Sequence, residues 1–356
     1  MKWSYFALLA AVFCSCVHAY DKKPEHSFYY WKTTFAGDSN DAKFILRNNI
    51  DHFYIHYFDV EWSEPLDMPV PVAEITGFKN SSLYTAKHYT PVIFITNKTF
   101  ENFNPYRQDS FEYNIRKKII FISNRIDENI PKAIKSAGKN NATAFSKIDE
   151  IQIDCDWTPS TQEKYFEFLK KLKSILPGKI ISATIRLYPY KYPDKMGVPP
   201  VDKGVLMCYN LSDIKSAGTV NSIFDVNELK QYLNAKPYPL PMDIALPVFG
   251  WYAWFSNDKY KGILYPDNNG EIKTGDEFFK KADSVITISR DTMWGKNFLR
   301  QGDILRPEYP DTVQLTAAAK LLKIKFPLTQ RISFYYYNYP SAKQYETAIQ
   351  RIYNLY

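Results

Sequence analysis

The segment Ile151-Gln-Ile-Asp-Cys-Asp-Trp-Thr158 decides the fold and points to a site. Its apolar residues predict a short buried β-strand, in which side chains alternate between the two faces. Asp154, Asp156 and Thr158 therefore share one face, and Cys155 lies on the other. A carboxylate inside a strand is costly unless it is paired or takes part in chemistry. The pair predicts a functional site; the alternative is two aspartates that only hydrogen-bond the end of a strand.

Short apolar segments recur along the chain, and most precede a segment with helical periodicity. Further strands are expected at residues 27–35, 52–62, 91–96, 180–188, 205–209, 243–250 and 332–337. Helices are expected at residues 40–48, 113–118, 160–176, 226–233 and 312–324, and from Ser341. Strands that alternate with helices pair in parallel and carry the helices outside. At 356 residues this predicts an α/β fold, the (β/α)8 TIM barrel. A doubly wound open sheet is the alternative, disfavoured by the lack of a glycine-rich first turn.

Some local features complete this organisation. Ile119–Ser123 has the composition of a short strand, and residues 131–137 that of a helix. Two capping boxes are expected at helix starts, Ser160 with Glu163 and Ser341 with Gln344. The interval from about 251 to 310 is too long for a simple loop between strand and helix. It predicts an insertion after the seventh barrel strand.

The first 19 residues have the features of an export signal, with Lys2 followed by an apolar run and then small residues. Two processing sites remain open. Cleavage after Ala19 fits the usual small-residue pattern, whereas Cys16 lies in a loose bacterial lipoprotein box and would carry a lipid anchor. The short apolar run favours Cys16. We expect residues 20–356 to form one exported domain, periplasmic or anchored to the outer membrane, because no later stretch reaches the ~18 apolar residues of a membrane span.

Composition narrows the classes of function. The net charge of +7 comes from scattered lysines without a basic block, so no nucleic-acid partner is expected. No glycine-rich phosphate loop is present, and we expect no cofactor and no metal. His52 and His56 share a strand face, but packed neutral histidines are favoured over a metal pair. Cys155 and Cys208 predict inert core thiols, and we expect a monomer. Aromatic residues make up 17% of the chain, which suits the flat faces of sugar rings.

Three segments, in order along the chain, resemble glycoside hydrolase family 18. Residues 153–157 resemble part of the signature D-x-x-D-x-D-W-E on that family's fourth barrel strand. Met207-Cys-Tyr-Asn210 is similar to the sixth-strand segment M-x-Y-D, and Ala245-Leu-Pro-Val-Phe-Gly-Trp251 to the seventh-strand segment L-P-x-Y-G. The resemblance covers roughly residues 27–356. It implies a barrel whose partner is an oligosaccharide or polysaccharide.

The chain departs from the family pattern at the residues that carry its chemistry. Ile151 stands at the first aspartate of the signature, and Thr158 stands at the catalytic glutamate. Asn210 replaces the aspartate after Tyr209. A threonine hydroxyl cannot protonate a leaving group as a carboxylic acid does. The resemblance is therefore to degenerate or uncharacterised bacterial members that lack the catalytic glutamate.

The same resemblance assigns expected roles. Asp156 would orient a polar group of the ligand, with Asn210 beside it, and Tyr209 would donate a hydrogen bond. Asp154, deeper in the barrel, would tune Asp156, and a close pair of carboxylates raises the pKa of one of them. Arg186 is either the counter-charge to both aspartates or a surface arginine at a strand end.

Other candidates lie at the ends of other predicted strands. Glu61, on one face with Asp59, is the candidate for a relocated general acid, although solvated carboxylates are the commoner outcome. Aromatic side chains that follow several strands are expected to bind sugar faces, about half of them lining a cleft: Trp31, Trp251, Trp254, Tyr335 and Tyr337.

Three hypotheses of function follow. The first is an exported barrel that binds an oligosaccharide in an aromatic cleft with weak or no hydrolysis. The second is an active glycosidase in which Glu61, or the pair Asp154 and Asp156, supplies the acid. The third is a structural or protein-interaction barrel. Thr158 favours the first over the second, and the lumen carboxylates favour both over the third.

Overall fold

The computed structural model describes residues 23–78, 83, 86, 88–104, 110–129, 147–216, 218–266, 272, 277–282 and 284–356. The predicted signal with Cys16 and the predicted helix at 131–137 lie outside the described residues. Within the described part of the chain, no helix combines the length and apolar character that crossing a bilayer requires.

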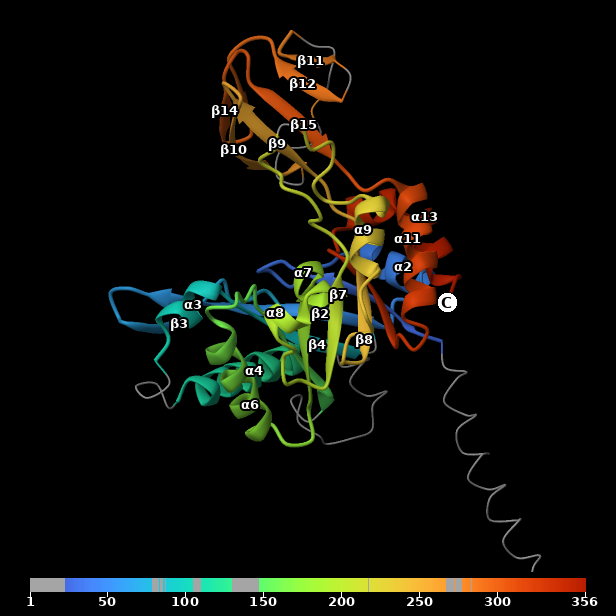
Figure 1. The fold of residues 1–356 in the computed structure, drawn as a ribbon. Helices are drawn as coiled ribbons and strands as arrows, with labels where there is room; N and C mark the ends of the chain where they lie inside the picture. Colours follow the sequence, from blue (N-terminus) through green and yellow to red (C-terminus); the bar gives the residue numbers. More distant parts are fainter. Residues whose placement is uncertain are drawn as a thin grey trace, which may run out of the picture.

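Eight parallel strands form a closed barrel (Figure 1). Each strand pairs with the next along the chain, and the last pairs with the first through Phe28 and Phe334. The strands are β1 (Glu25–Tyr30), β2 (His52–Ser63), β4 (His88–Ile95), β5 (Glu150–Asp154), β6 (Ile180–Arg186), β7 (Lys203–Met207), β8 (Met242–Pro247) and β16 (Arg331–Tyr335). The predicted (β/α)8 barrel is thereby confirmed. A further strand, β3 (Met68–Val72), runs antiparallel beside β2.

Helices surround the barrel and bury one apolar face against it. In α6 (Gln162–Ser174) the buried residues are Tyr165, Phe168, Leu169 and Leu172, the spacing of one helical face. The other helices are α2 (Ser39–Arg47), α3 (Asn97–Asn102), α4 (Phe111–Asn129), α7 (Leu187–Lys191), α8 (Pro193–Met196), α9 (Val226–Leu233), α11 (Thr312–Lys325), α12 (Tyr339–Gln344) and α13 (Glu346–Tyr353).

Some local predictions were wrong. Ile119–Ser123 belongs to α4, where Ile115, Ile119, Ile122 and Ile126 are buried at helical spacing. A short apolar run fits either structure, and here the neighbouring turns decide. Neither predicted capping box forms: Thr161 is the N-cap of α6 without a side-chain capping bond, and Asn338 is the N-cap of α12.

A buried ionic cluster fills the amino end of the barrel. Arg331 lies 2.8 Å from Glu150, and Lys203 lies 3.0 Å from Glu150 and 2.8 Å from Asp243. Burial opposes ionisation of Glu150, but the two cations hold its pKa below the usual range. Buried charges are tolerated when they are paired in this way. The cluster joins β5, β7, β8 and β16 and serves the fold.

The predicted insertion at about 251–310 is a separate antiparallel sheet. Its strands are β9 (Trp251–Ser256), β10 (Lys259–Leu264), β11 (Phe279–Ala282), β12 (Val285–Ile288) and β15 (Ile304–Glu308), with a hairpin of β13 (Thr292–Trp294) and β14 (Asn297–Leu299). The sheet has its own small apolar core, which includes Ile288, Leu299 and Leu305. Gly250 lies where the chain enters the sheet, and a Cβ there would meet the Tyr309 ring at 2.1 Å. Glycine therefore permits the close passage of the two connecting segments.

Candidate functional site

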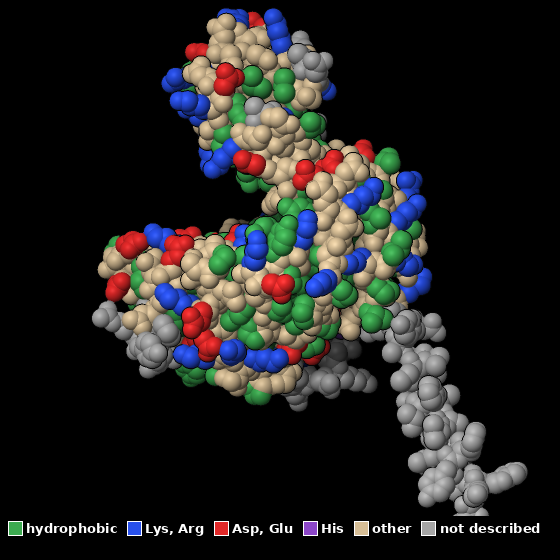
Figure 2. Space-filling model, in the orientation of Figure 1, with side chains coloured by type: hydrophobic (Ala, Val, Ile, Leu, Met, Phe, Trp, Pro, Cys, Tyr) green, Lys and Arg blue, Asp and Glu red, His purple; other side chains and the backbone are tan. Residues whose placement is uncertain are grey.

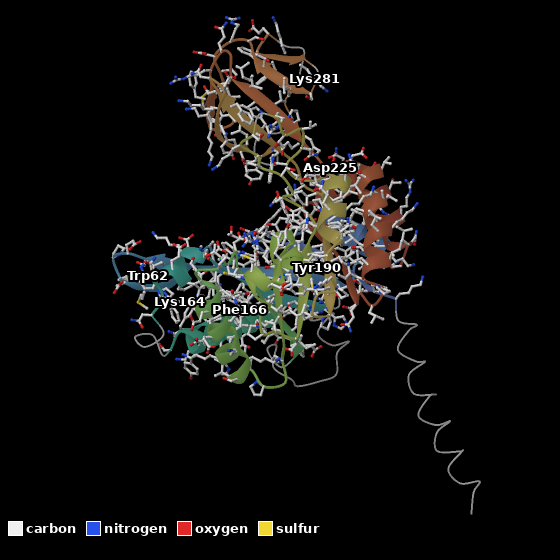
Figure 3. All side chains as sticks on the ribbon, viewed as in Figure 1. Trp62, Lys164, Phe166, Tyr190, Asp225 and Lys281 are labelled. Atoms are coloured by element: carbon white, nitrogen blue, oxygen red, sulfur yellow. The ribbon has the colours of Figure 1, made fainter. Side chains whose placement is uncertain are left out.

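The carboxyl ends of the barrel strands open into a wide notch (Figure 2). The insertion forms its upper side, and the barrel with the ribbon of β2 and β3 forms its lower side (Figure 1). Trp62, near the end of β2, lies on that ribbon (Figure 3). Sites of (β/α)8 barrels lie at this end.

Two carboxylates meet one cation at the ends of β5 and β6. Asp154 is the last residue of β5, is only 8% exposed, and accepts a 2.5 Å hydrogen bond from the Thr184 hydroxyl. Asp156, two residues beyond, is half-exposed, and its Oδ1 lies 3.0 Å from Nε of Arg186. Arg186 also donates through Nη2 to the carbonyl of Trp157 at 2.6 Å. Of the two alternatives for Arg186, the structure selects the counter-charge to Asp156.

Asp154 is poised to exchange a proton near neutral pH. Burial raises its pKa to about 7, and the negative charge of Asp156 adds to this, while the Thr184 hydrogen bond and the Arg186 charge act in the opposite direction. The charge of Asp156 thus raises the pKa of Asp154 in the direction expected of a close pair of carboxylates, but burial is the larger cause. At neutral pH the protonated fraction of Asp154 can donate a hydrogen bond and the ionised fraction can accept one.

Aromatic rings gather beside these carboxylates. Tyr209 stacks on Tyr335 with centroids 5.0 Å apart, Trp31 lies 5.6 Å from Tyr335, and Phe249 contacts Tyr209 edge-on. The buried Oη of Tyr209 has no hydrogen-bond partner among the described residues. Burial raises its pKa well above the ordinary value, so the hydroxyl stays protonated and can donate. A buried donor without a partner is the type of group that a ligand satisfies.

The pairing of His56 with Asp59 beside these rings was not predicted from the sequence. Nε2 of His56 lies 2.6 Å from Asp59, and its ring lies 4.7 Å from Trp31. A register shift between His56 and Phe58 brings residues 56 and 59 together. Simple alternation along a strand cannot reveal such a bulge, because the bulge adds one residue to the count.

The position of the family's acid holds only a hydroxyl. Thr158 Oγ1 lies 2.9 Å from the Ser160 hydroxyl and 3.2 Å from that of Thr161, at the start of α6. Glu61 is exposed and lies on the ribbon, where it pairs with Val70 of β3 beyond the last pair of β2 with β4. Asn210 is exposed with a φ of 56°, and its backbone N–H donates to Ile223.

The structure corrects the expected sugar platforms at Trp251 and Tyr337. Trp251 is buried, and its indole N–H donates to Glu308 at 3.0 Å within the insertion sheet, while Glu308 also accepts from the backbone N–H of Ser222, in the segment after β7. Tyr337 is buried outside the barrel against Phe28 and donates to Asp41 of α2. Both rings fill space between elements. Trp254 is partly buried in the insertion sheet and donates to Asp303. Trp31 and Tyr335 remain as partly exposed rings beside the carboxylates.

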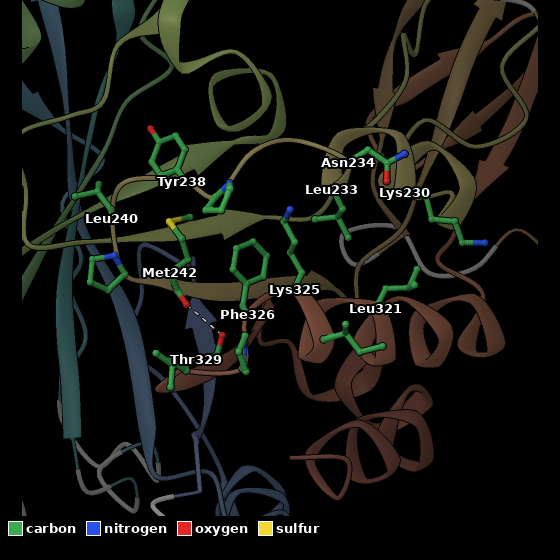
Figure 4. A pocket seen from close by; sticks show the side chains of 15 residues that line it. Lys230, Leu233, Asn234, Tyr238, Leu240, Met242, Leu321, Lys325, Phe326 and Thr329 are labelled. Atoms are coloured by element: carbon green, nitrogen blue, oxygen red, sulfur yellow. Dashed lines mark hydrogen bonds between the residues drawn. The ribbon is translucent and has the colours of Figure 1, made fainter. Parts of the chain in front are cut away.

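A pocket of about 600 Å³ lies elsewhere, between α9, α11 and the first residue of β8 (Figure 4). Leu233, Met242 and Phe326 are among its mainly apolar lining residues. It opens near the amino end of β8, away from the strand ends that carry Asp154 and Arg186. The perturbed carboxyl and the donor without a partner are therefore not part of it.

No group of three or more His, Cys, Asp or Glu side chains that could hold a metal occurs within the described residues. Both ring nitrogens of His52 are engaged, with the hydroxyls of Ser27 and Thr90 at 2.9 Å each. Burial lowers the pKa of His52 well below its ordinary value, which corresponds to a packed neutral ring. Cys155 and Cys208 are free and buried, as predicted.

No family model matches the chain, and no curated protein matches its sequence. Similar solved structures include the catalytic domain of a psychrophilic chitinase B from Arthrobacter TAD20, with a TM-score of 0.48, 10% identity, and coverage of 94% of this chain and 96% of that chain. A chitinase from Chromobacterium violaceum has a TM-score of 0.46 and 10% identity, with coverage of 90% of this chain and 98% of that chain. A glycoside hydrolase family 18 N-acetylglucosaminidase from Paenibacillus barengoltzii has a TM-score of 0.46 and 10% identity, with coverage of 93% of this chain and 99% of that chain. These similarities concern the fold and no more.

Proposed function

We propose that this protein binds an oligosaccharide in the notch at the carboxyl end of its barrel and hydrolyses it slowly or not at all. The observation that carries the proposal is the buried Tyr209 hydroxyl, which has no partner among the described residues. It lies beside the partly exposed ring of Tyr335. A flat ring with adjacent donors and acceptors matches a sugar, which has apolar faces and hydroxyl edges.

The polar groups around the rings have complementary capacities. Asp156 is half-exposed, so one of its oxygens can accept from a ligand while the other faces Arg186. Tyr209 can donate a hydrogen bond, and near neutral pH Asp154 can either donate or accept one. Catalysis by the family's route needs an acid at the position that Thr158 occupies. The arrangement therefore supports binding more strongly than cleavage.

A binding panel tests the proposal. Neutral and N-acetylated oligosaccharides are titrated calorimetrically into the purified protein, together with Trp31→Ala, Tyr209→Phe and the control Tyr113→Phe on the exposed face of α4. We expect Trp31→Ala to weaken binding by about 30-fold, as for a central aromatic contact. Tyr209→Phe removes one hydrogen bond to the ligand and should lower the affinity by up to about tenfold. Absence of any glycan binding by the wild type would refute the proposal.

A second candidate function is slow hydrolysis with Asp154 as the acid. Its pKa of about 7 is the observation in favour, because a general acid must hold its proton at the working pH. Release of a coloured aglycone from aryl glycosides, lost in Asp154→Asn and retained in Glu61→Gln, would establish it. No release by the wild type would leave binding as the function.

We also propose that the chain is exported and carries a lipid at Cys16. The apolar run before the Ser-Cys step supports this. Mass spectrometry of the mature N-terminus separates the alternatives, because cleavage after Ala19 leaves an unmodified Tyr20. Detection of that unmodified terminus would refute the lipid anchor.

A further inference from the structure

A second group of aromatic rings lies directly after β6. Tyr188 of α7 is 47% exposed, and its ring centroid is 4.8 Å from that of Tyr192. These tyrosines are four residues apart in sequence, and Arg186 is two residues before the first. Figure 1 places α7 below the notch and α9 at its inner side. The tyrosine pair is therefore close in the chain to the site around Asp156.

Two lysines flank these tyrosines. Nζ of Lys191 lies 5.4 Å from the ring centroid of Tyr192 and 5.4 Å from that of Tyr232 in α9. Nζ of Lys195 lies 5.5 Å from the centroid of Tyr192. Neither lysine has a carboxylate within ion-pair distance among the residues that the structure describes. An ammonium group over a ring keeps its charge and presents its remaining donors to the solvent.

We propose that Tyr188, Tyr192, Lys191 and Lys195 form a subsite for an acidic sugar, so that the preferred ligand is a glycan with carboxylate or sulfate groups. This inference rests on the proposed function and names its ligand class. The tyrosine pair offers a face to the sugar ring, and the two ammonium groups meet an anionic substituent at its edge. We call these four residues the tyrosine–lysine subsite.

The local charges are consistent with an anion. The exposed Asp194 lies between the lysines in sequence, which leaves an excess of one positive charge in this segment. Asp156 has Arg186 at 3.0 Å and so repels an anion less than a free carboxylate. The alternative role is structural. Lys191 joins α7 to α9 through Tyr232, and Lys195 packs on Tyr192. That role depends on packing and not on the charge of a ligand.

Matched ligands separate the two roles. Calorimetric titrations compare a neutral chito-hexaose, a uronate-containing hyaluronan hexasaccharide and a sulfated chondroitin hexasaccharide, at low and at high salt. The proteins are the wild type, Lys191→Met, Lys195→Met and the control Lys320→Met on the exposed side of α11. We expect each subsite variant to weaken acidic-glycan binding about fivefold while neutral-glycan binding and the thermal midpoint stay unchanged. Lys320→Met should match the wild type.

Several outcomes would overturn the inference. Equal wild-type affinity for neutral and acidic glycans would do so while leaving the proposed function intact. The same holds for a fall in thermal midpoint without a change in acidic-glycan affinity. Binding of neither ligand class would refute both proposals together. A dependence on uronate but not on sulfate, or the reverse, identifies the anionic group that the subsite accepts.

Discussion

Replacement of Asp154 by asparagine should raise the free energy of unfolding relative to the wild type, and this gain should grow as the pH rises. Burial raises the pKa of Asp154 from 3.8 to about 7, so the folded state holds this proton more tightly than the unfolded state. The favourable contribution is complete below pH 3.8 and is lost as the pH rises through about 7. At ~1.4 kcal/mol per pH unit the full loss is at most about 4 kcal/mol, of which about 2.5 kcal/mol falls between pH 5 and pH 8.

The substitution Asp154→Asn removes this titration and keeps an oxygen that accepts from Thr184. Urea unfolding at pH 5, 6, 7 and 8 gives the free energy of unfolding of both proteins. We expect the variant to gain about 2.5 kcal/mol on the wild type over this range. Burial lowers the pKa values of His26 and His52, which makes the folded state more stable as the pH rises. Both proteins share this contribution, so it cancels when the free energies of unfolding of variant and wild type are subtracted.

The control is Asp194→Asn, which removes an exposed carboxylate. This variant keeps the Asp154 carboxyl, so it should lose stability between pH 5 and pH 8 as the wild type does. A constant difference for Asp154→Asn, within ~0.5 kcal/mol, would refute the argument that Asp154 is held protonated by burial. A carboxyl resonance of Asp154 that titrates below pH 5 would refute it as well.

Three further predictions use unfolding and binding measurements. Arg331→Met leaves Glu150 with less counter-charge and should lower the free energy of unfolding by about 3–5 kcal/mol in urea; a loss below ~1 kcal/mol would contradict a paired role. Tyr209→Phe should leave the free energy of unfolding within about 0.5 kcal/mol of the wild type, because the hydroxyl has no partner among the described residues; a larger loss would reveal a hidden bond. Glu61→Gln should change neither glycan affinity nor hydrolysis, and a tenfold fall in either would restore Glu61 as the acid.

The barrel could be predicted because each strand leaves a local signal. The strand expected at 52–62 is β2 (His52–Ser63), and the helix expected at 226–233 is α9 (Val226–Leu233). Turn signals and apolar periodicity are properties of neighbouring residues, so they survive in the sequence. The run Ile119–Ser123 was misassigned because five residues do not distinguish a strand from one side of a helix.

The site was harder to predict because it depends on contacts between distant segments. Asp154 and Arg186 could be placed by alternation along their strands. The burial of Trp251 could not, because its partner Glu308 lies 57 positions later in the chain, in the last strand of the insertion sheet. Nor could the orientation of Tyr337, which follows the end of β16 and turns outward to α2. An aromatic residue after a strand can fill a core or face a ligand, and only the packing decides.

The strand β5 carries perturbed carboxyls at both ends of the barrel, and the two ends treat them differently. It carries three buried polar side chains in alternation, namely Glu150, Gln152 and Asp154. Arg331 and Lys203 hold the pKa of Glu150 below its usual range despite burial, whereas burial and the charge of Asp156 raise the pKa of Asp154 to about 7. At the amino end Glu150 lies within ion-pair distance of two cations, which it shares with Asp243 and Glu25, whereas no cation lies within ion-pair distance of Asp154 among the described residues. A fold that needed only stability would place an apolar residue at that position. The uncompensated Asp154, next to a half-exposed Asp156 and a tyrosine donor without a partner among the described residues, is therefore best explained by a ligand that completes the set.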